Sequence, residues 1–139
     1  MVLMNLLRAL LDAKGFDYTE HDDTIQMRMR ADHRRWNAVF CADDEGFLRY
    51  YGRYPMRVPE DRADAVLAVL NRLNTGLRAG CFLLSDGYPM FRYGAYIFDE
   101  YTAALSVADL VTVSMAETAA AWDAIEDAAC GRQYRSGNE

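Results

Sequence analysis

The residue types that most often carry chemistry are scattered along this sequence. Its three cysteines, Cys41, Cys81 and Cys130, form no CxxC pair and no other metal-like spacing. Cys41 and Cys81 lie in apolar segments that we expect to be strands, which favours inert core thiols over nucleophiles. An odd number of cysteines also suits a reducing compartment. The cysteines therefore predict neither a metal centre nor a thiol enzyme.

Two histidines, His21 and His33, flank one expected strand, and Asp22 and Asp23 follow the first of them. This group could ligate a metal ion, but the sequence lacks the HExxH or paired-cysteine spacing of known metal sites. Exposed turn residues are the commoner interpretation. Glycine-rich phosphate loops of the GxGxxG or GxxxxGK type are absent as well. We therefore expect a protein that is not an enzyme and that holds no metal and no cofactor.

The best candidate for a binding surface is a set of arginines and tyrosines at alternating positions. If Met27, Trp36, Tyr50 and Phe91 point inward, the intervening side chains of their strands point outward. Such a face would be basic and aromatic on an acidic protein, and it would suit a carboxylate-rich peptide or a phosphate. The alternative is a solvated sheet surface whose arginines pair with neighbouring acids. The predicted partner-binding face consists of Arg28, Arg30, Asn37, Arg49, Tyr51, Arg53, Arg92 and Tyr96.

The elements that must position this face are organised around residues 58–84. Pro59 is suited to the first position of a helix, and Gly76 to the left-handed position after its end. The apolar side of this helix is expected to contain Ala63, Val66, Leu67, Leu70 and Leu73.

The opposite side of the same helix is narrow, and it suggests a contact between two copies of the chain. Small residues allow a second helix to approach closely, as in a symmetric dimer. The alternative is that alanines on an exposed face are simply good helix formers. The candidate dimer face is Ala65, Ala68, Val69 and Arg72.

The rest of the chain predicts one helix, then strands, then a closing helix. A leucine-rich helix over residues 2–14 ends at Gly15, and three strands follow before the central helix. A hairpin comes after that helix, and Ser106 is the expected cap of a last helix that runs to about Cys130. The order α-β-β-β-α-β-β-α predicts an α+β fold with an antiparallel sheet and helices packed on one face. We expect residues 1–130 to form a single domain and 131–139 a flexible tail.

Composition limits the class of protein. The chain has 139 residues, of which 52% are hydrophobic and 26% charged, with a net charge of −6. Such a chain should fold as one domain, should repel nucleic acid and anionic membranes, and would suit a basic partner. Residues 1–11 lack the features of a signal peptide, and we find no stretch near the roughly twenty apolar residues of a membrane span. A cytoplasmic location is the expectation.

Several short motifs resemble those of the YbjN family. They are Val58-Pro59-Glu60, Leu70-Asn71-Arg72-Leu73-Asn74, Gly80 leading into the apolar run 81–84, and Leu105-Ser106. The resemblance covers the chain from about Asp17 onward. It implies a fold similar to the class I chaperones of type III secretion, which are small, acidic, mostly homodimeric proteins that hold segments of a client and catalyse nothing.

Together these features predict a non-enzymatic, chaperone-like or regulatory homodimer. Its partner would be a cytoplasmic client protein, for which a basic or a nucleic-acid-handling protein is a candidate. The alternative is a sensor that binds a small anionic ligand or single-stranded nucleic acid on the arginine and tyrosine face.

Overall fold

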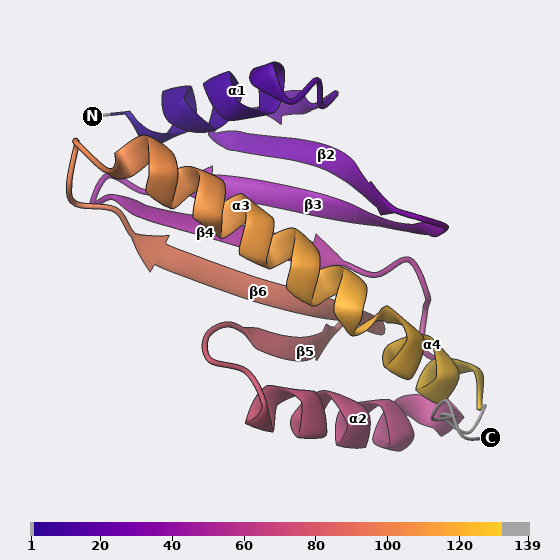
Figure 1. The fold of residues 1–139 in the computed structure, drawn as a ribbon. Coiled ribbons are helices and arrows are strands. Elements are labelled where there is room, and N and C mark those ends of the chain that lie inside the picture. Colours follow the sequence, from indigo (N-terminus) through magenta and orange to yellow (C-terminus); the bar gives the residue numbers. More distant parts are fainter. Residues whose placement is uncertain (1, 132–139) are drawn as a thin grey trace.

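The computed structural model describes residues 2–131, and these form an α+β fold built on one antiparallel sheet (Figure 1). The sheet has six strands in the order β1-β2-β3-β4-β6-β5. The predicted tail, residues 131–139, lies outside the described part of the chain apart from Gly131. The elements are α1 Leu3–Ala13, β1 Thr19–His21, β2 Thr24–Ala31, β3 Arg34–Ala42, β4 Phe47–Arg53, the 3-10 turn η1 Glu60–Arg62, α2 Ala63–Thr75, β5 Cys81–Ser85, β6 Tyr88–Tyr96, α3 Ala103–Ala120 and α4 Trp122–Cys130.

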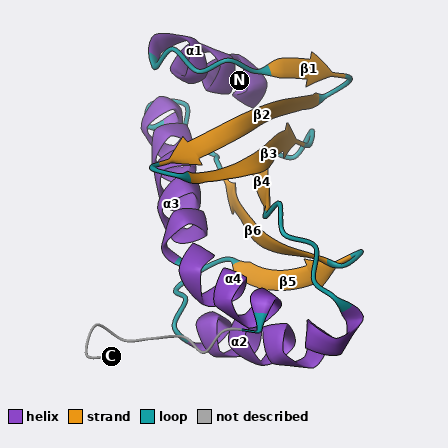
Figure 2. Cartoon of the chain, turned by 90° about the vertical axis from the view of Figure 1, so that its right-hand side faces the viewer, coloured by secondary structure: helices purple, strands orange, loops and turns teal. Residues whose placement is uncertain are grey.

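The helices leave one face of the sheet uncovered. Helix α3 runs across the other face, with α1 beside it near β2, and α2 together with α4 near β5 (Figure 1). Figure 2 shows that the sheet curls away from α3 at both ends, so that its uncovered face is concave. This arrangement confirms the predicted α+β class with an antiparallel sheet.

The covered face follows the period-two pattern of the strands. Met27, Trp36, Tyr50 and Phe91 are all buried, as predicted, and they pack with α3 and α1. Full burial of a large apolar side chain stabilises the fold by about 1.5–3 kcal/mol relative to exposure. The largest fully buried side chains are Trp36, Tyr50, Tyr54, Phe40, Phe91, Leu7, Leu11, Ile25, Met29, Leu48, Leu70 and Ile125.

Buried polar groups link the sheet to α3. The Trp36 indole Nε1 donates a hydrogen bond to the Tyr50 hydroxyl over 2.8 Å, and that hydroxyl lies 2.9 Å from Oγ1 of Thr118. Because Thr118 Oγ1 donates to the Ser114 carbonyl over 2.7 Å, the Tyr50 hydroxyl must be the donor to Thr118. The Tyr54 hydroxyl donates to the Thr118 carbonyl over 2.6 Å. Burial raises the pKa of Tyr50 to about 12.

The free edge of β5 is occupied by a side chain of α2. Nδ2 of Asn74 donates to the Phe82 carbonyl over 2.9 Å, and the Phe82 N–H donates to Oδ1 of Asn74 over 2.6 Å. An amide side chain thus satisfies the two backbone groups that an adjacent strand would otherwise pair with. This contact explains why an asparagine ends the Leu-Asn-x-Leu-Asn segment.

An additional strand, β1, precedes the three that we predicted before the central helix. Residues Thr19–His21 pair with Thr24–Gln26, and the turn between them is only Asp22 and Asp23, with Asp22 at φ 54°. Of the residues interpreted as an exposed turn, Asp22 and Asp23 therefore form the turn, whereas His21 belongs to β1. All three residues of β1 are exposed, so the strand has no hydrophobic alternation to reveal it.

The closing helix differs from the prediction at its start and in its middle. It begins at Ala103, so Ser106 lies inside α3 and makes no side-chain cap. Its backbone N–H bonds to the Thr102 carbonyl over 2.9 Å, as in an ordinary helical turn. A break at Ala121 then separates α3 from α4.

The central helix also departs from the prediction at its ends. Pro59 precedes the 3-10 turn η1, so the α-helix itself begins only at Ala63. Gly76 has φ −96°, which is a right-handed conformation and not the left-handed one predicted. Leu67 was assigned to the buried side, but 47% of its surface is exposed because β5 and α4 together cover only part of the helix.

The segment Ala103–Cys130 is long and apolar enough to cross a membrane by length and composition. This corrects the expectation that no stretch approaches such a length. The core helix of a globular protein passes the same test, and here the inner stripe of α3, including Val107 and Leu110, packs on the sheet. The helix is therefore weak evidence for a membrane span.

Candidate functional site

The uncovered face of the sheet carries the residues that we predicted to bind a partner. Strand pairing aligns Gln26, Val39, Tyr51, Arg92 and Cys81 in one row across the sheet. A second row contains Arg28, Asn37, Arg53 and Met90, and Arg30 and Arg49 lie on the same side. Tyr96, which is paired with Phe47, completes the predicted set at the end of β6.

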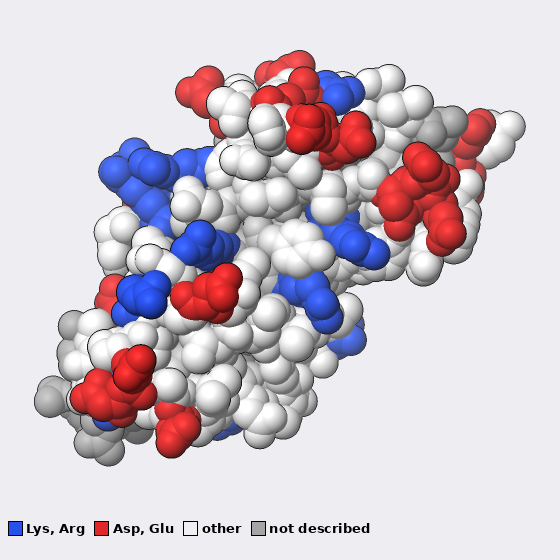
Figure 3. All heavy atoms as spheres, turned by 180° about the vertical axis from the view of Figure 1, so that it is seen from behind, with Lys and Arg blue, Asp and Glu red and all other residues white. Residues whose placement is uncertain are grey.

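The strands contribute positive but no negative charge to this face, and Asp17, from the loop before β1, lines the larger hollow. The outward positions of the strands hold no aspartate or glutamate, and none of the outward arginines forms an ion pair within residues 2–131. Figure 3, which looks onto this side, shows blue side chains around a white centre, one red group against the blue ones left of the centre, and most of the other red side chains toward the two ends. The alternative of arginines paired with nearby acids is therefore not what the structure contains. The outward arginines are Arg28, Arg30, Arg35, Arg49, Arg53 and Arg92.

Arg35 was missing from the predicted face. It is paired with Arg30 at the end of the β2–β3 hairpin and is exposed. Continuing the period-two pattern back from Trp36 would have found it.

A larger hollow lies over β2, β3 and β4, with a volume of about 710 Å³. Arg28, Asn37 and Arg53 line it together with the half-buried side chains of Val39 and Tyr51. Its floor is thus apolar and its rim cationic, a combination that suits a partner with both an apolar and an anionic group. The remaining lining residues are Asp17, Tyr18, Thr19, Gln26, Met27, Ala38 and Met90.

The guanidinium group of Arg53 is held in place at the rim of the larger hollow. Its carbon Cζ lies 3.8 Å from the centre of the Tyr88 ring, and that of Arg57 lies 5.6 Å from the same ring. A guanidinium stacked on an aromatic ring keeps its N–H edges available for hydrogen bonds. Arg53 is therefore partly ordered before any partner arrives.

A smaller hollow of about 440 Å³ lies over β4, β6 and the start of β5. It shares Tyr51 with the larger hollow and is also lined by Phe47, Arg49, Arg92 and Cys81. The two hollows therefore form one continuous candidate surface with Tyr51 between them.

Aromatic rings extend the smaller hollow toward the end of β6. The ring of Phe47 meets Tyr96 edge-on at 4.6 Å, and Tyr96 stacks on Phe98 at 5.5 Å. A Cβ at position 94 would lie 2.4 Å from the Phe47 ring, so glycine there lets this ring lie close to the β6 backbone. Tyr96 and Phe98 are both largely exposed. These rings offer stacking surface next to the arginines.

Cys41 and Cys81 lie on this face and not in the core, contrary to the prediction. Both are half-buried, and Cys41 is paired with Arg49 across β3 and β4. Burial raises the pKa of the Cys41 thiol, and the nearby Arg49 only partly opposes that shift. The thiol is therefore protonated at neutral pH, which does not favour a nucleophilic role.

The histidines are far apart along the sheet. His21 and His33 lie at opposite ends of β2, and His21 is 3.5 Å from Asp22 in an exposed pair. Within residues 2–131 no group of three histidine, cysteine or acidic side chains could hold a metal ion.

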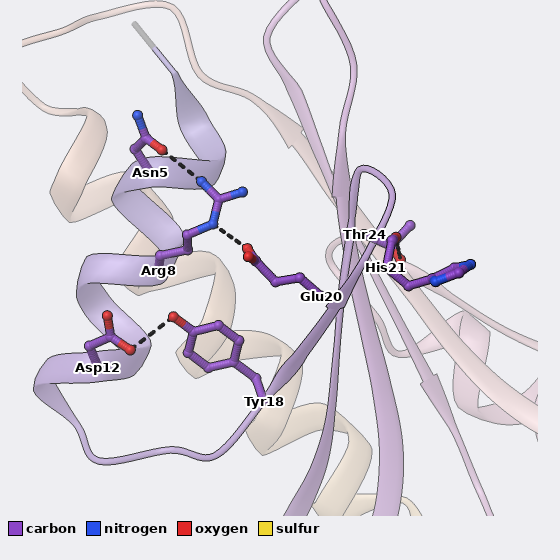
Figure 4. Close-up of polar contacts among 7 residues, drawn as sticks. All are labelled: Asn5, Arg8, Asp12, Tyr18, Glu20, His21 and Thr24. Carbon is purple, nitrogen blue, oxygen red and sulfur yellow. Dashed lines mark hydrogen bonds and ion pairs between the residues drawn. The ribbon is translucent and has the colours of Figure 1, made fainter.

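The rim of the larger hollow next to β1 is fixed to α1 (Figure 4). Arg8 pairs with Glu20 of β1 and donates to Oδ1 of Asn5 over 2.7 Å. The Tyr18 hydroxyl donates to Asp12 over 2.9 Å, and this bond raises the pKa of Tyr18. These bonds anchor the edge strand that bounds the candidate surface.

The four residues of the candidate dimer face are not equally accessible. Ala65 and Val69 are half-buried, and Val69 packs against the core, because α4 lies against this part of α2. Ala68 and Arg72 are exposed, and the exposed Leu67 lies beside them. A second copy could therefore contact only part of the predicted strip.

The comparisons with known proteins agree on one family. Residues 4–126 match the sequence profile of the YbjN family, which is described as "Putative bacterial sensory transduction regulator". The fold is similar to the crystal structure of YbjN, "a putative transcription regulator from E. coli", with a TM-score of 0.56 and 13% identity over 86% of this chain and 95% of that one. A comparison with curated protein sequences gave no match. Because the profile spans nearly the whole described chain, the protein belongs to the YbjN family.

Proposed function

We propose that this protein is a non-enzymatic regulatory module that binds a segment of another protein on the uncovered face of its sheet. The observation that carries the proposal is the set of outward arginines, none of which forms an ion pair within residues 2–131, spread over two hollows that share Tyr51. Charges left unpaired on a concave surface attract an oppositely charged partner and orient it.

The chemistry of the face favours an acidic and partly aromatic or aliphatic segment. Carboxylates would pair with arginines such as Arg28 and Arg92, while apolar side chains would cover Val39 and Tyr51. This differs from the basic client expected from the net charge of −6. Local charge decides what docks at a surface, whereas net charge acts mainly at longer range.

Self-association through α2 is the second part of the proposal. Leu67 and Ala68 are exposed next to each other, and an exposed leucine beside a small residue supports close helix contact. A symmetric dimer would present two copies of the docking face to one client.

The docking face can be tested by selecting peptides from a displayed library of random sequence with the purified full-length protein. We expect enrichment of sequences that contain several aspartates or glutamates near an apolar residue. The double variant Arg28→Glu and Arg53→Glu should lose that enrichment, because the rim of the larger hollow would then repel them.

A matched control changes charge by the same amount elsewhere. Lys14→Glu with Arg78→Glu alters two exposed positions outside the strands and should leave the selected sequences unchanged. Equal loss in both double variants would show that only net charge matters and would refute a local site.

The competing function is a sensor for single-stranded nucleic acid on the same face. Stacked rings next to arginines are the features such a site needs. Anisotropy of a labelled oligonucleotide over a salt series would reveal it as tight binding that weakens steeply with salt. Such salt-dependent oligonucleotide binding, together with a peptide selection that enriches no acidic sequences, would favour the nucleic-acid sensor over the protein-binding module.

A further inference from the structure

One row of the uncovered face brings two arginines to either side of an amide. Strand pairing places Arg28 of β2 opposite Asn37 of β3, and Asn37 opposite Arg53 of β4. Neighbouring strands are about 4.8 Å apart, so the two arginine backbones lie roughly 10 Å from each other. Arginine side chains easily span half of that distance. The side chain of Arg28 can therefore reach a group bound above Asn37, and that of Arg53 can reach it by turning from the Tyr88 ring of β6 on which it is stacked.

The donors of this row, which we call the anion row (Arg28, Asn37 and Arg53), are free of competing partners. None of the three forms a side-chain hydrogen bond or ion pair with another residue of the described chain. Arg53 stacks on Tyr88 of β6 at 3.8 Å, a contact that leaves its N–H groups without an acceptor in the described chain. An anion that binds these donors therefore breaks no hydrogen bond within the described chain.

The number and charge of these donors match a phosphate monoester better than a carboxylate. A single arginine already satisfies both oxygens of a carboxylate in a bidentate pair. A phosphate monoester offers three terminal oxygens and a charge of about −1.5 to −2 at pH 7. Two guanidinium groups with an amide N–H₂ between them supply matching charge and a donor for each oxygen.

The surroundings of the row indicate that the phosphate belongs to a peptide. The same hollow has half-buried apolar surface from Val39, Tyr51 and Met90, which a free phosphate ion would leave uncovered. We propose that the anion row binds a phosphorylated serine or threonine in a segment of the protein partner. The inference rests on the docking face proposed above and specifies its central contact.

The test is a titration of the isotope-labelled protein followed by NMR. Three capped peptides of one sequence, Gly-Ala-X-Leu-Gly, would carry phosphoserine, glutamate or serine at X, at equal ionic strength. We expect the phosphoserine peptide to bind about tenfold more tightly than the glutamate peptide, with the largest shifts on β2, β3 and β4. The serine peptide should not bind measurably.

Variants locate the contact within the face. Arg28→Gln and Arg53→Gln should each remove the preference for phosphoserine over glutamate. Arg78→Gln makes the same charge change at an exposed position outside the face, and it should keep the preference. All of these positions are exposed, and unchanged thermal unfolding would show that the variants fold.

The pH provides a second readout that a merely structural role would not affect. The second ionisation of a phosphate monoester has a pKa of about 6, while arginines do not titrate in this range. The preference for phosphoserine should therefore fall between pH 7 and pH 5.5.

Three outcomes would overturn the inference. Equal binding of the phosphoserine and glutamate peptides would leave an acidic-peptide face without phosphate recognition, so the proposed function would survive. Inorganic phosphate binding as tightly as the phosphopeptide would identify a free anion as the ligand. An unchanged preference in Arg28→Gln and Arg53→Gln would place the phosphate elsewhere. The peptide selection that tests the proposed function uses unphosphorylated peptides. A failure of that selection can therefore be distinguished from the three outcomes above.

Discussion

The two faces of the sheet are built from the same strands but have opposite properties. On β4, Tyr50 is fully buried under α3 and bonded to Trp36 and Thr118, while the next residue, Tyr51, lies open between the two hollows. On the covered face the side chains of Trp36, Tyr50 and Thr118 are joined by hydrogen bonds, although Oγ of Ser114 is buried there without a partner in the described chain. On the uncovered face arginines remain unpaired within the described chain.

The contrast shows which face is optimised for stability. Arginines that form no ion pair repel one another and contribute little to folding. If this face served only to keep the protein soluble, interspersed positive and negative side chains would serve that purpose better. The uncovered face therefore carries a cost that the covered face avoids, which is the expected mark of a binding surface.

The largest expected difference between the faces concerns truncation on β3. Phe40→Ala removes a fully buried ring and should lower the free energy of unfolding by about 3–5 kcal/mol. Asn37→Ala, on the opposite face of the same strand, should change it by about 0.5 kcal/mol or less. Urea unfolding followed by circular dichroism would measure both. Similar losses would mean that the uncovered face is also packed.

The next effect is a loss of stability at alkaline pH from the covered face. The pKa of Tyr50 is raised from 10.0 to about 12 in the folded protein, mainly by burial. Its protonated hydroxyl therefore stabilises the fold fully below pH 10, and this contribution is lost as the pH rises through 12. The difference corresponds to about 2–3 kcal/mol.

Urea unfolding at pH 8 and at pH 11 would measure this loss, and Tyr50→Phe should reduce it. At pH 8 the same variant should cost about 1–3 kcal/mol, because the Trp36 indole N–H loses its acceptor. Tyr51→Phe, on the uncovered face, should change neither quantity. An unaltered pH dependence in Tyr50→Phe would mean that another group dominates.

A smaller effect on the free energy of unfolding is expected at the β5 edge of the sheet. Asn74→Ala would remove both hydrogen bonds to the Phe82 backbone and should lower the free energy of unfolding by about 1–2 kcal/mol. The exposed β5 edge should also promote association at high protein concentration. Asn71→Ala, three residues earlier on the same helix and exposed, is the control and should be near neutral.

The smallest effect on stability is expected on α2. Ala68→Glu should change the free energy of unfolding by about 0.5 kcal/mol or less but convert a dimer into a monomer. Light scattering would measure the molar mass of the unmodified protein and of the Ala68→Glu variant. The exposed Ala116→Glu on α3 is the control. A monomer in the unmodified protein would remove self-association from the proposal without touching the docking face.

Local patterns predicted most of the elements. The leucines of α1 recur at helical spacing, and the alternation in β2 correctly assigned Met27 inward and Arg28 outward. Strand β1 was missed because its residues are all exposed, and the break at Ala121 was missed because the sequence continues to read as a helix there. Whether Cys41 and Leu67 are buried depends on which surfaces other elements cover. A local sequence pattern does not contain that information.

By itself, the sequence determined the fold class, the family and the identity of most outward residues, because these follow from short-range periodicity and local motifs. Only the tertiary structure decided that Arg28, Asn37 and Arg53 share one row, that none of the outward arginines forms an ion pair within residues 2–131, and that the face is concave. Strand order, register and curvature arise from contacts between residues distant in the chain. A binding surface built across several strands exists only once those contacts have formed.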